Sequence, residues 1–154
     1  MRTAIILAIA LLPPGAAAHS AEDDIEAAIN ARHGYFTLLG ANVGPLAAMA
    51  KGETEYDAET AAFHARNLSQ LAGYDPSFHF PEGSSKAERP GKTRALAAIW
   101  ENLEDFQSKH RDFSEAVAAL QGAAGAGRAE LGAAVGDLGQ TCKACHDDYR
   151  AEDF

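Results

Sequence analysis

Apolar residues recur every three or four positions along most of this sequence, and this spacing limits the possible folds more than any other feature. In the last helical segment these positions are Leu131, Val135, Leu138, Cys142, Cys145 and Tyr149. No stretch alternates apolar and polar residues with β-branched enrichment, and Ala is abundant throughout. The pattern is typical of amphipathic helices that pack through one apolar stripe.

Four such helical segments are predicted. They cover residues 22–50, 58–71, 93–120 and 128–151. Pro45 is expected to kink the first helix or end it early, and Gly52 marks its close. Asp57 is a suitable N-cap for the second helix. The connection 73–91 has a length typical of a functional or mobile loop. Four helices with short or moderate links predict an all-α fold, an antiparallel four-helix bundle.

The first twenty residues have the pattern of a secretory signal peptide. Arg2 gives a positive start, and an apolar run and small residues follow it up to Ala18. The apolar run is too short to span a bilayer. Cleavage after Ala18 and cleavage after Ser20 both fit the small-residue rule. An ordinary N-terminal helix is the less favoured alternative. The prediction is a signal peptide over 1–20, export to the periplasm, and one domain over 21–154.

Size and charge exclude several classes of function. The chain has 154 residues, which is room for one hydrophobic core. Its 13 Lys and Arg against 22 Asp and Glu give a formal net charge of −9. So acidic a balance argues against binding to nucleic acid or to an anionic membrane surface. A protein that docks on it is expected to be basic.

Both cysteines lie in one short motif, Cys142-Lys143-Ala144-Cys145-His146, which is the attachment signature of c-type haem. On a helix, thiols three positions apart share one face and reach the two vinyl groups of one porphyrin. The His that follows can bind the iron from the same side. The sequence therefore predicts one covalent haem c, attached through Cys142 and Cys145, with His146 as the axial iron ligand.

Other uses of these cysteines fit less well. A redox-active dithiol is expected beside a βαβ pattern, and no strand is predicted. A structural zinc site needs four ligands, and no second Cys or His pair completes the set. A disulfide within one helical turn is geometrically awkward. The sequence also has no paired carboxylates, no Ser/His/Asp arrangement and no Gly-rich phosphate loop, so no enzyme activity is predicted.

The sequence resembles the cytochrome c′ family, the class II c-type cytochromes, over nearly the whole mature chain. The matching segments are Asn30-Ala31-Arg32-His33-Gly34-Tyr35-Phe36, Lys51-Gly52, Tyr56-Asp57-Ala58, Ala98-Ile99-Trp100 and Cys142-Lys143-Ala144-Cys145-His146-Asp147-Asp148-Tyr149-Arg150. The resemblance implies a four-helix bundle with the haem held near one end, usually as a homodimer. It also implies five-coordinate, high-spin iron on His146, with Phe36 blocking the opposite face.

The resemblance suggests roles for further residues at the haem. Arg32 matches an Arg that lies against a haem propionate; snorkelling to the bundle edge is the alternative. Thr93 and Arg94 fall where the family often places a haem-edge residue. Arg150 matches the basic residue beside the iron-binding His; an exposed ion pair with Asp147 or Glu152 is equally compatible with the sequence. In this family the position of His33 is often Gln, so a His there could compete for the iron.

These observations predict a haem protein that binds NO or CO and transfers single electrons, with an unidentified redox partner. The alternative is a low-spin, six-coordinate electron carrier, which in this class uses a Met on the first helix where Phe36 stands. Met49 is 49 − 36 = 13 residues further on, about 20 Å along a helix. A peroxidase-like enzyme is the weakest reading, since only His33 could serve as a polar group over the iron. A homodimer is expected through the outer face of the first helix, with Leu38, Leu46 and Met49.

Overall fold

The computed structural model describes residues 20–154. In this part of the chain the regular secondary structure is helical, with one isolated bridge between Ala95 and Arg150. The predicted signal peptide lies outside the described residues except for Ser20. The elements are α1 (Ala21–Lys51), α2 (Ala58–Ala72), the 3₁₀ helix η1 (Pro76–His79), α3 (Ala98–Glu101), α4 (Leu103–Ala123) and α5 (Arg128–Tyr149).

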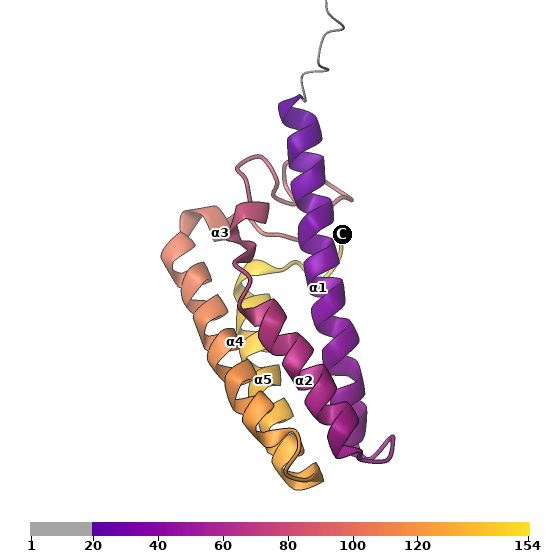
Figure 1. Ribbon diagram of the computed structural model, residues 1–154. Helices are drawn as coiled ribbons and strands as arrows, with labels where there is room; N and C mark the ends of the chain where they lie inside the picture. Colours follow the sequence, from indigo (N-terminus) through magenta and orange to yellow (C-terminus); the bar gives the residue numbers. More distant parts are fainter. Residues whose placement is uncertain (1–19) are drawn as a thin grey trace, which may run out of the picture.

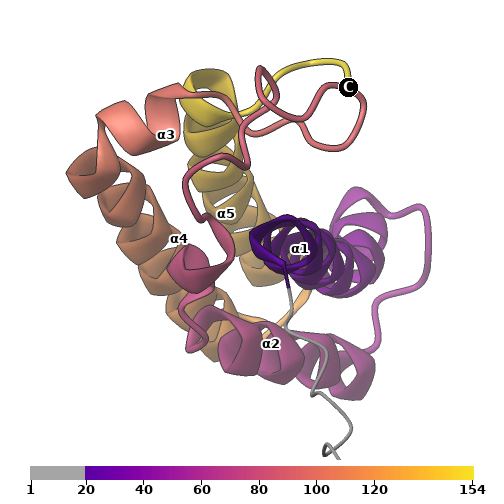
Figure 2. The ribbon, with the colours of Figure 1, turned by 90° about the horizontal axis from the view of Figure 1, so that it is seen from above.

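The four long helices form an antiparallel bundle, which confirms the predicted fold class (Figure 1). α1 packs against α2 and α5, and α4 packs against the same two helices, so the four form a closed ring. The view along the bundle in Figure 2 shows the connection between α2 and α4 crossing one end. The C-terminal residues lie at that same end.

Local capping sets the ends of α1 and α2. The Ser20 hydroxyl accepts a hydrogen bond from the Asp23 backbone N–H (3.2 Å), and the Asp23 carboxylate accepts one from the Ser20 N–H (3.2 Å). This reciprocal capping box satisfies two backbone donors. Asp57 caps α2 by accepting from the Thr60 N–H at 2.7 Å. Gly52 closes α1 with φ +75°, a left-handed conformation that suits glycine.

Pro45 does not end α1. The helix continues to Lys51 with Pro45 inside it, so the prediction of an early end is wrong. The next turns are held in place because Leu46 and Met49 are buried in the core. This packing stabilises the helix beyond the one hydrogen bond that a proline removes.

The third helix begins later than the sequence predicts. Its first helical residue is Ala98, and a break at Asn102 separates α3 from α4. Residues 93–97 pair with the end of α5 instead: the Leu96 N–H donates to the Tyr149 carbonyl at 3.0 Å, and the Ala151 N–H to the Arg94 carbonyl at 2.8 Å. The same pairing ends α5 at Tyr149 rather than Ala151.

Two groups of buried side chains fill the bundle. The larger group comes from all four long helices and includes Leu46, Leu68, Leu120 and Leu138. The smaller group lies near the α2–α4 connection and consists of Ala95, Ile99, Phe106 and Tyr149. Cys142 packs against the larger group and Cys145 against the smaller one. The cysteine motif therefore lies where the two groups meet, near one end of the bundle.

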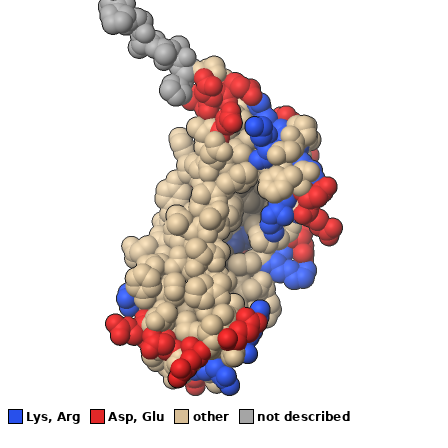
Figure 3. Space-filling view, turned by 90° about the vertical axis from the view of Figure 1, so that its right-hand side faces the viewer, with Lys and Arg blue, Asp and Glu red and all other residues tan. Residues whose placement is uncertain are grey.

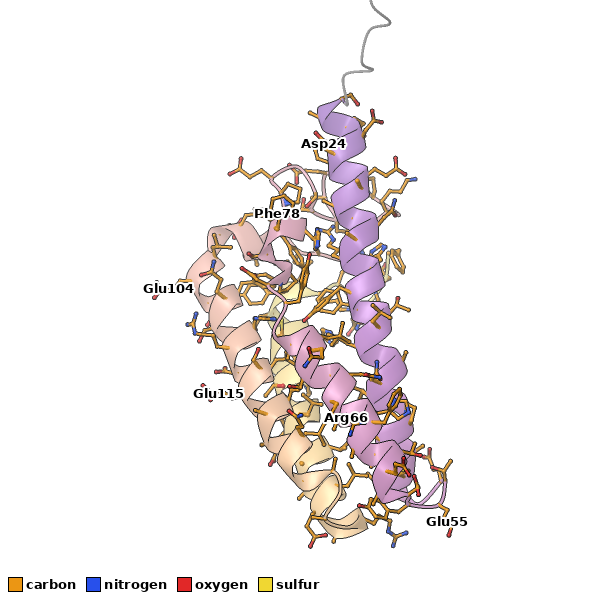
Figure 4. All side chains as sticks on the ribbon, in the orientation of Figure 1. Asp24, Glu55, Arg66, Phe78, Glu104 and Glu115 are labelled. Atoms are coloured by element: carbon orange, nitrogen blue, oxygen red, sulfur yellow. The ribbon has the colours of Figure 1, made fainter. Side chains whose placement is uncertain are left out.

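The surface is unevenly charged. The sequence has no Asp, Glu, Lys or Arg between Arg32 and Lys51, and Figure 3 shows this part of α1 as an uncharged ridge with acidic residues at both ends. Figure 4 shows Glu104 and Glu115 projecting outward from α4. Among the helices of residues 20–154, none is long and apolar enough to cross a membrane.

Candidate functional site

The motif residues lie on the last two turns of α5. Because the helix is continuous there, Cys142 and Cys145 share one face and His146 follows one position later. Both thiols are free and half-buried, and His146 is exposed. A pocket of about 390 Å³ opens beside His146. Its other lining residues are Arg94, Asp147, Arg150, Ala151 and Glu152.

Burial keeps both thiols protonated. It raises the pKa of Cys145 to about 11, although the positive charge of Lys109 acts in the opposite direction. Burial also raises the pKa of Cys142, while hydrogen bonding around Thr141 partly offsets the effect. A protonated thiol is a weak nucleophile and a poor metal ligand. The two cysteines are thus kept unreactive at neutral pH until a partner group is brought next to them.

His146 is held in its neutral form. Partial burial and the positive charge of Arg94 lower its pKa, and the carboxylate of Asp147 opposes them. A neutral imidazole is the form that binds iron. Among the residues described, no group of three or more His, Cys, Asp or Glu side chains is placed to hold a metal ion.

Arg94, rather than Arg150, is the cation whose charge lowers the pKa of His146. Its Nη1 donates to the Glu152 carbonyl at 3.1 Å, and its guanidinium lies over the ring of Phe154, 5.0 Å from the centroid. No sequence pattern pointed to a role for Phe154. The C-terminal residues therefore hold Arg94 next to the pocket.

Arg150 lines the same pocket but makes neither of the ion pairs considered from the sequence. Asp147 instead pairs with Lys143, one turn earlier on α5. Within residues 20–154, no ion pair joins Arg150 to Asp147 or Glu152. Both ion-pair alternatives are wrong. Asp147 pairs with its i,i+4 neighbour on the same helix, and the backbone carbonyl of Glu152 accepts from Arg94.

Arg32 is buried, with 2% of its surface exposed, so the snorkelling alternative is wrong. It donates to the Ser84 hydroxyl at 3.0 Å, to the Ser84 carbonyl at 2.6 Å and to the Thr93 hydroxyl at 2.6 Å. Its guanidinium also lies 4.9 Å from the centroid of the Phe80 ring. All these partners are uncharged and belong to the α2–α4 connection, so Arg32 ties α1 to that connection. Thr93 is buried with it.

Phe36 lies on the inward stripe of α1, between Arg32 and Leu39, yet 45% of its surface is exposed. Its neighbours on the stripe are buried or half-buried, so Phe36 differs from them and is not part of the packed core. Figure 3 shows the surface hollowed beside the α1 ridge. Phe36 is thus an uncovered apolar side chain on this helix, and it has no lone pair to offer a metal.

His33 is exposed and lies beside the C-terminal residues. Its ring meets Phe154 edge-on, with centroids 6.2 Å apart. Partial burial and the charges of Arg32 and Arg94 lower its pKa. His33, Arg94 and Phe154 are therefore neighbours, although they are far apart in the sequence.

A covalently attached haem fits these residues. Two free thiols stand on one helical face with a neutral His beside them, and α1, the neighbour of α5, carries an uncovered Phe36. Bound there, a haem would supply an iron that holds diatomic ligands and changes by one electron at a time.

Comparisons with known proteins agree with this arrangement. The family model described as Cytochrome C' matches residues 27–150. The cytochrome c' of Cereibacter sphaeroides is 50% identical over 151 residues, which cover 98% of each chain. The solved structure "Cytochrome c' from Rhodobacter Spheriodes" superposes with a TM-score of 0.81 at 53% identity, covering 84% of this chain and 98% of that one.

Two further solved structures carry small gases. A nitric oxide complex of a cytochrome c prime variant from Alcaligenes xylosoxidans has a TM-score of 0.72, and a carbon monoxide complex of another variant has 0.71. Both are 32% identical, covering 83% of this chain and 97% of theirs. The match to the family model and the 50% identity over nearly the whole chain lead to one conclusion. The chain belongs to the cytochrome c′ family of c-type cytochromes, whose members carry covalently bound haem c.

Proposed function

We propose that the protein is a periplasmic mono-haem cytochrome that binds NO and CO and exchanges single electrons. Its iron is five-coordinate and high-spin, held by His146 alone. The observation that carries this proposal is the exposure of Phe36 on the otherwise buried stripe of α1. The NO and CO complexes of relatives support the choice of ligands.

The proposed roles follow from the contacts of each residue. Cys142 and Cys145 attach the haem, and His146 binds the iron. Arg94 and Arg150 line the pocket beside His146, and the positive charge of Arg94 favours the neutral imidazole. Arg32 and Thr93 support the haem edge by fixing the α2–α4 connection. His33 contacts the haem edge from α1.

The selectivity follows from the chemistry of Phe36. An apolar ring over the sixth position of the iron excludes water and gives an incoming anion no hydrogen bond. An ion entering such a site loses its hydration without compensation. A neutral diatomic molecule has little hydration to lose, so NO and CO are favoured. Because only His33 could assist O–O cleavage, we expect peroxide to react slowly at the iron, and we propose no dedicated enzymatic activity.

The low-spin alternative needs a second protein ligand. Met49, the only Met in residues 20–154, is 3% exposed and packs in the large core group with Leu46 and Leu68. This burial among core side chains disfavours it as an iron ligand. His33 is then the first residue to test as a sixth ligand.

The role of Phe36 can be tested by CO binding to the reduced holoprotein. Replacing Phe36 by Ala opens the site, and we expect the CO association rate to rise at least tenfold. Phe63→Ala is the matched control, since Phe63 is a similarly exposed ring on α2. Equal CO association rates in wild type and Phe36→Ala would show that Phe36 does not cover the iron.

Export and dimerisation complete the proposal. Cleavage after Ala18 is favoured over cleavage after Ser20, because Ser20 provides the N-cap of α1. We place the homodimer contact on the uncharged outer face of α1. Leu46 and Met49, which the sequence suggested for this contact, belong to the core, so that part of the prediction is wrong. Leu38 is exposed and remains part of the face.

A further inference from the structure

Four aromatic rings form a continuous row through the upper part of the bundle, from Trp100 through Phe80 and Phe106 to Tyr149. The successive ring centroids are 6.4, 5.0 and 5.4 Å apart. Trp100 and Phe80 are half-buried, and Phe106 and Tyr149 are buried. We call this set the aromatic row. It joins a partly solvent-accessible indole to a phenol inside the protein.

The inner end of the aromatic row lies at the cysteine motif. Tyr149 is one helical turn beyond Cys145 on α5, and Cys145 packs against the buried group that contains Phe106 and Tyr149. An edge of the porphyrin attached through Cys145 would therefore lie next to Tyr149. The two oxidisable side chains of the row are Tyr149 at the haem end and Trp100 at the outer end.

Tyr149 also has a proton acceptor. Its hydroxyl donates to the Asp105 carboxylate on α4 at 2.6 Å, and Asp105 is open to solvent. Two other tyrosines differ in this respect. Tyr35 donates to the Leu71 carbonyl and Tyr56 to the Ala124 carbonyl, and a backbone carbonyl does not take up a proton. A phenol that loses an electron must also release its proton, and only Tyr149 of these three is placed to do so.

The proton stays on the phenol at rest. Burial and the hydrogen bond to Asp105 raise the pKa of Tyr149 to about 12. Packing alone would be satisfied by a Phe at this position. The short hydrogen bond to a carboxylate is the feature that a purely structural cluster does not need.

We propose that the aromatic row carries single electrons from Trp100, at the surface, to a haem that a peroxide has oxidised. This transfer would protect the protein from oxidative damage. The inference rests on the haem of the proposed function.

One H₂O₂ takes two electrons and two protons to become two waters, which leaves the haem site two electrons short. Tyr149 supplies one electron toward the haem while its proton passes to Asp105. Trp100 then returns an electron to Tyr149, and Asp105 returns the proton. A one-electron reductant in solution, such as ascorbate, restores Trp100, and a second round completes the balance.

The test uses the ferric holoprotein, H₂O₂ and a nitroso spin trap, with the adducts located by peptide mass spectrometry. In wild type we expect adducts on Trp100. In Trp100→Phe we expect them to move to Tyr149. In Tyr149→Phe we expect the Trp100 adduct to disappear and haem absorbance to bleach at least threefold faster.

Asp105→Asn keeps the shape of an exposed side chain and removes only the proton acceptor. We expect it to reduce the Trp100 adduct at least threefold even if Tyr149→Phe does not fold. Tyr56→Phe is the matched control and should change neither adducts nor bleaching. Unchanged adducts in both Tyr149→Phe and Asp105→Asn, or wild-type adducts on Tyr35 or Tyr56 instead of the row, would overturn the proposal.

The same samples separate this inference from the proposed function. Addition of NO to the reduced holoprotein reports the open iron site independently of the adduct map. A normal NO response with adducts away from the row rejects the relay alone. Adducts on Trp100 with no NO response reject the proposed gas binding alone.

Discussion

Arg32 has an unusual environment for a cation. It is buried, and its hydrogen-bond partners in the described part of the chain are uncharged oxygens of the α2–α4 connection. A buried charge is stable only when its donors are satisfied. Removing Arg32 would take away the donors that it gives to the Ser84 and Thr93 oxygens, although Thr93 Oγ1 would still accept from the Ala95 N–H. It would also leave a cavity between α1 and the connection.

We predict that Arg32→Ala lowers the free energy of unfolding by about 3–5 kcal/mol, from lost charge-assisted hydrogen bonds and the cavity. Urea denaturation of the holoprotein measures it. Arg66→Ala, at an exposed position on α2 (Figure 4), should change stability by less than about 0.5 kcal/mol. Equal effects of the two variants would mean that the Arg32 hydrogen bonds contribute no net stability.

The Cys145 thiol provides a prediction with a defined pH dependence. Its pKa is raised from 9.0 to about 11, so at pH 8 the folded, haem-free chain should be alkylated about a hundredfold more slowly than the chain in urea. Cys142→Ser isolates the single thiol, and mass spectrometry follows its reaction with iodoacetamide. The raised pKa also means that the stability contributed by the protonated thiol is present below pH 9 and is lost as the pH rises through about 11. Identical alkylation rates with and without urea contradict the burial of this thiol.

At the level of single residues, the sequence predicted what depends on local spacing. Cys142, Cys145 and His146 share one helical turn, so a continuous helix is enough to bring them together. The sequence left open an ion pair between Arg150 and Asp147, and the structure pairs Asp147 with Lys143 instead, because sequence spacing alone does not rank the two. No sequence pattern predicted a role for Phe154, because its contacts with His33 and Arg94 depend on the path of the C-terminal residues.

At the level of helices, ends set by local caps were predicted to within about one residue. α2 begins after Asp57, as expected, and α1 closes at Gly52. The start of the third helix was wrong because residues 93–97 form backbone hydrogen bonds with the end of α5, which no local signal records. Leu103 fits the spacing of the apolar residues in the predicted third helix. The break at Asn102 nevertheless turns it outward, and 48% of its surface is exposed.

Replacement of two glycines by Ala should change the stability of the protein in opposite directions. Gly52 has φ +75°, and a Cβ there would lie 2.9 Å from Arg128 Nη1, so Gly52→Ala should destabilise the protein by about 1 kcal/mol. Gly136 lies inside α5 with open space around it, so Gly136→Ala should stabilise the protein by about 0.5–1 kcal/mol. Thermal unfolding of the holoprotein measures both. Stabilisation by Gly52→Ala would contradict the left-handed end of α1.

At the level of the whole molecule, the uncharged face of α1 is the surface on which the proposed homodimer depends. A charge placed there should be buried without a partner on association. We predict that Ala41→Glu, at an exposed position of α1, converts the dimer to a monomer in sedimentation velocity. Ala118→Glu, at an exposed position of α4, should leave the dimer intact. If both variants remain dimeric, the dimer contact lies on another face of the protein. If the wild type is monomeric, the proposed homodimer is wrong.

The arrangement of the helices also determines where the cysteine motif lies in the bundle. The core groups are separate, and the cysteine motif lies between them on the helix that neighbours α1. The sequence predicted the bundle from its apolar stripes, but not the exposure of Phe36. That exposure depends on how far α1, α5 and the α2–α4 connection stand apart, which is a property of the assembled fold.

The central claim is that His146 alone holds the iron and that Phe36 covers the opposite position without binding the iron. The most direct measurement is the visible spectrum of the dithionite-reduced holoprotein before and after addition of NO. We predict a broad, high-spin spectrum that changes when NO is added, in wild type and in His33→Ala alike. A sharp, low-spin spectrum that does not respond to NO would contradict the account. If that spectrum became high-spin in His33→Ala, the sixth ligand would be His33.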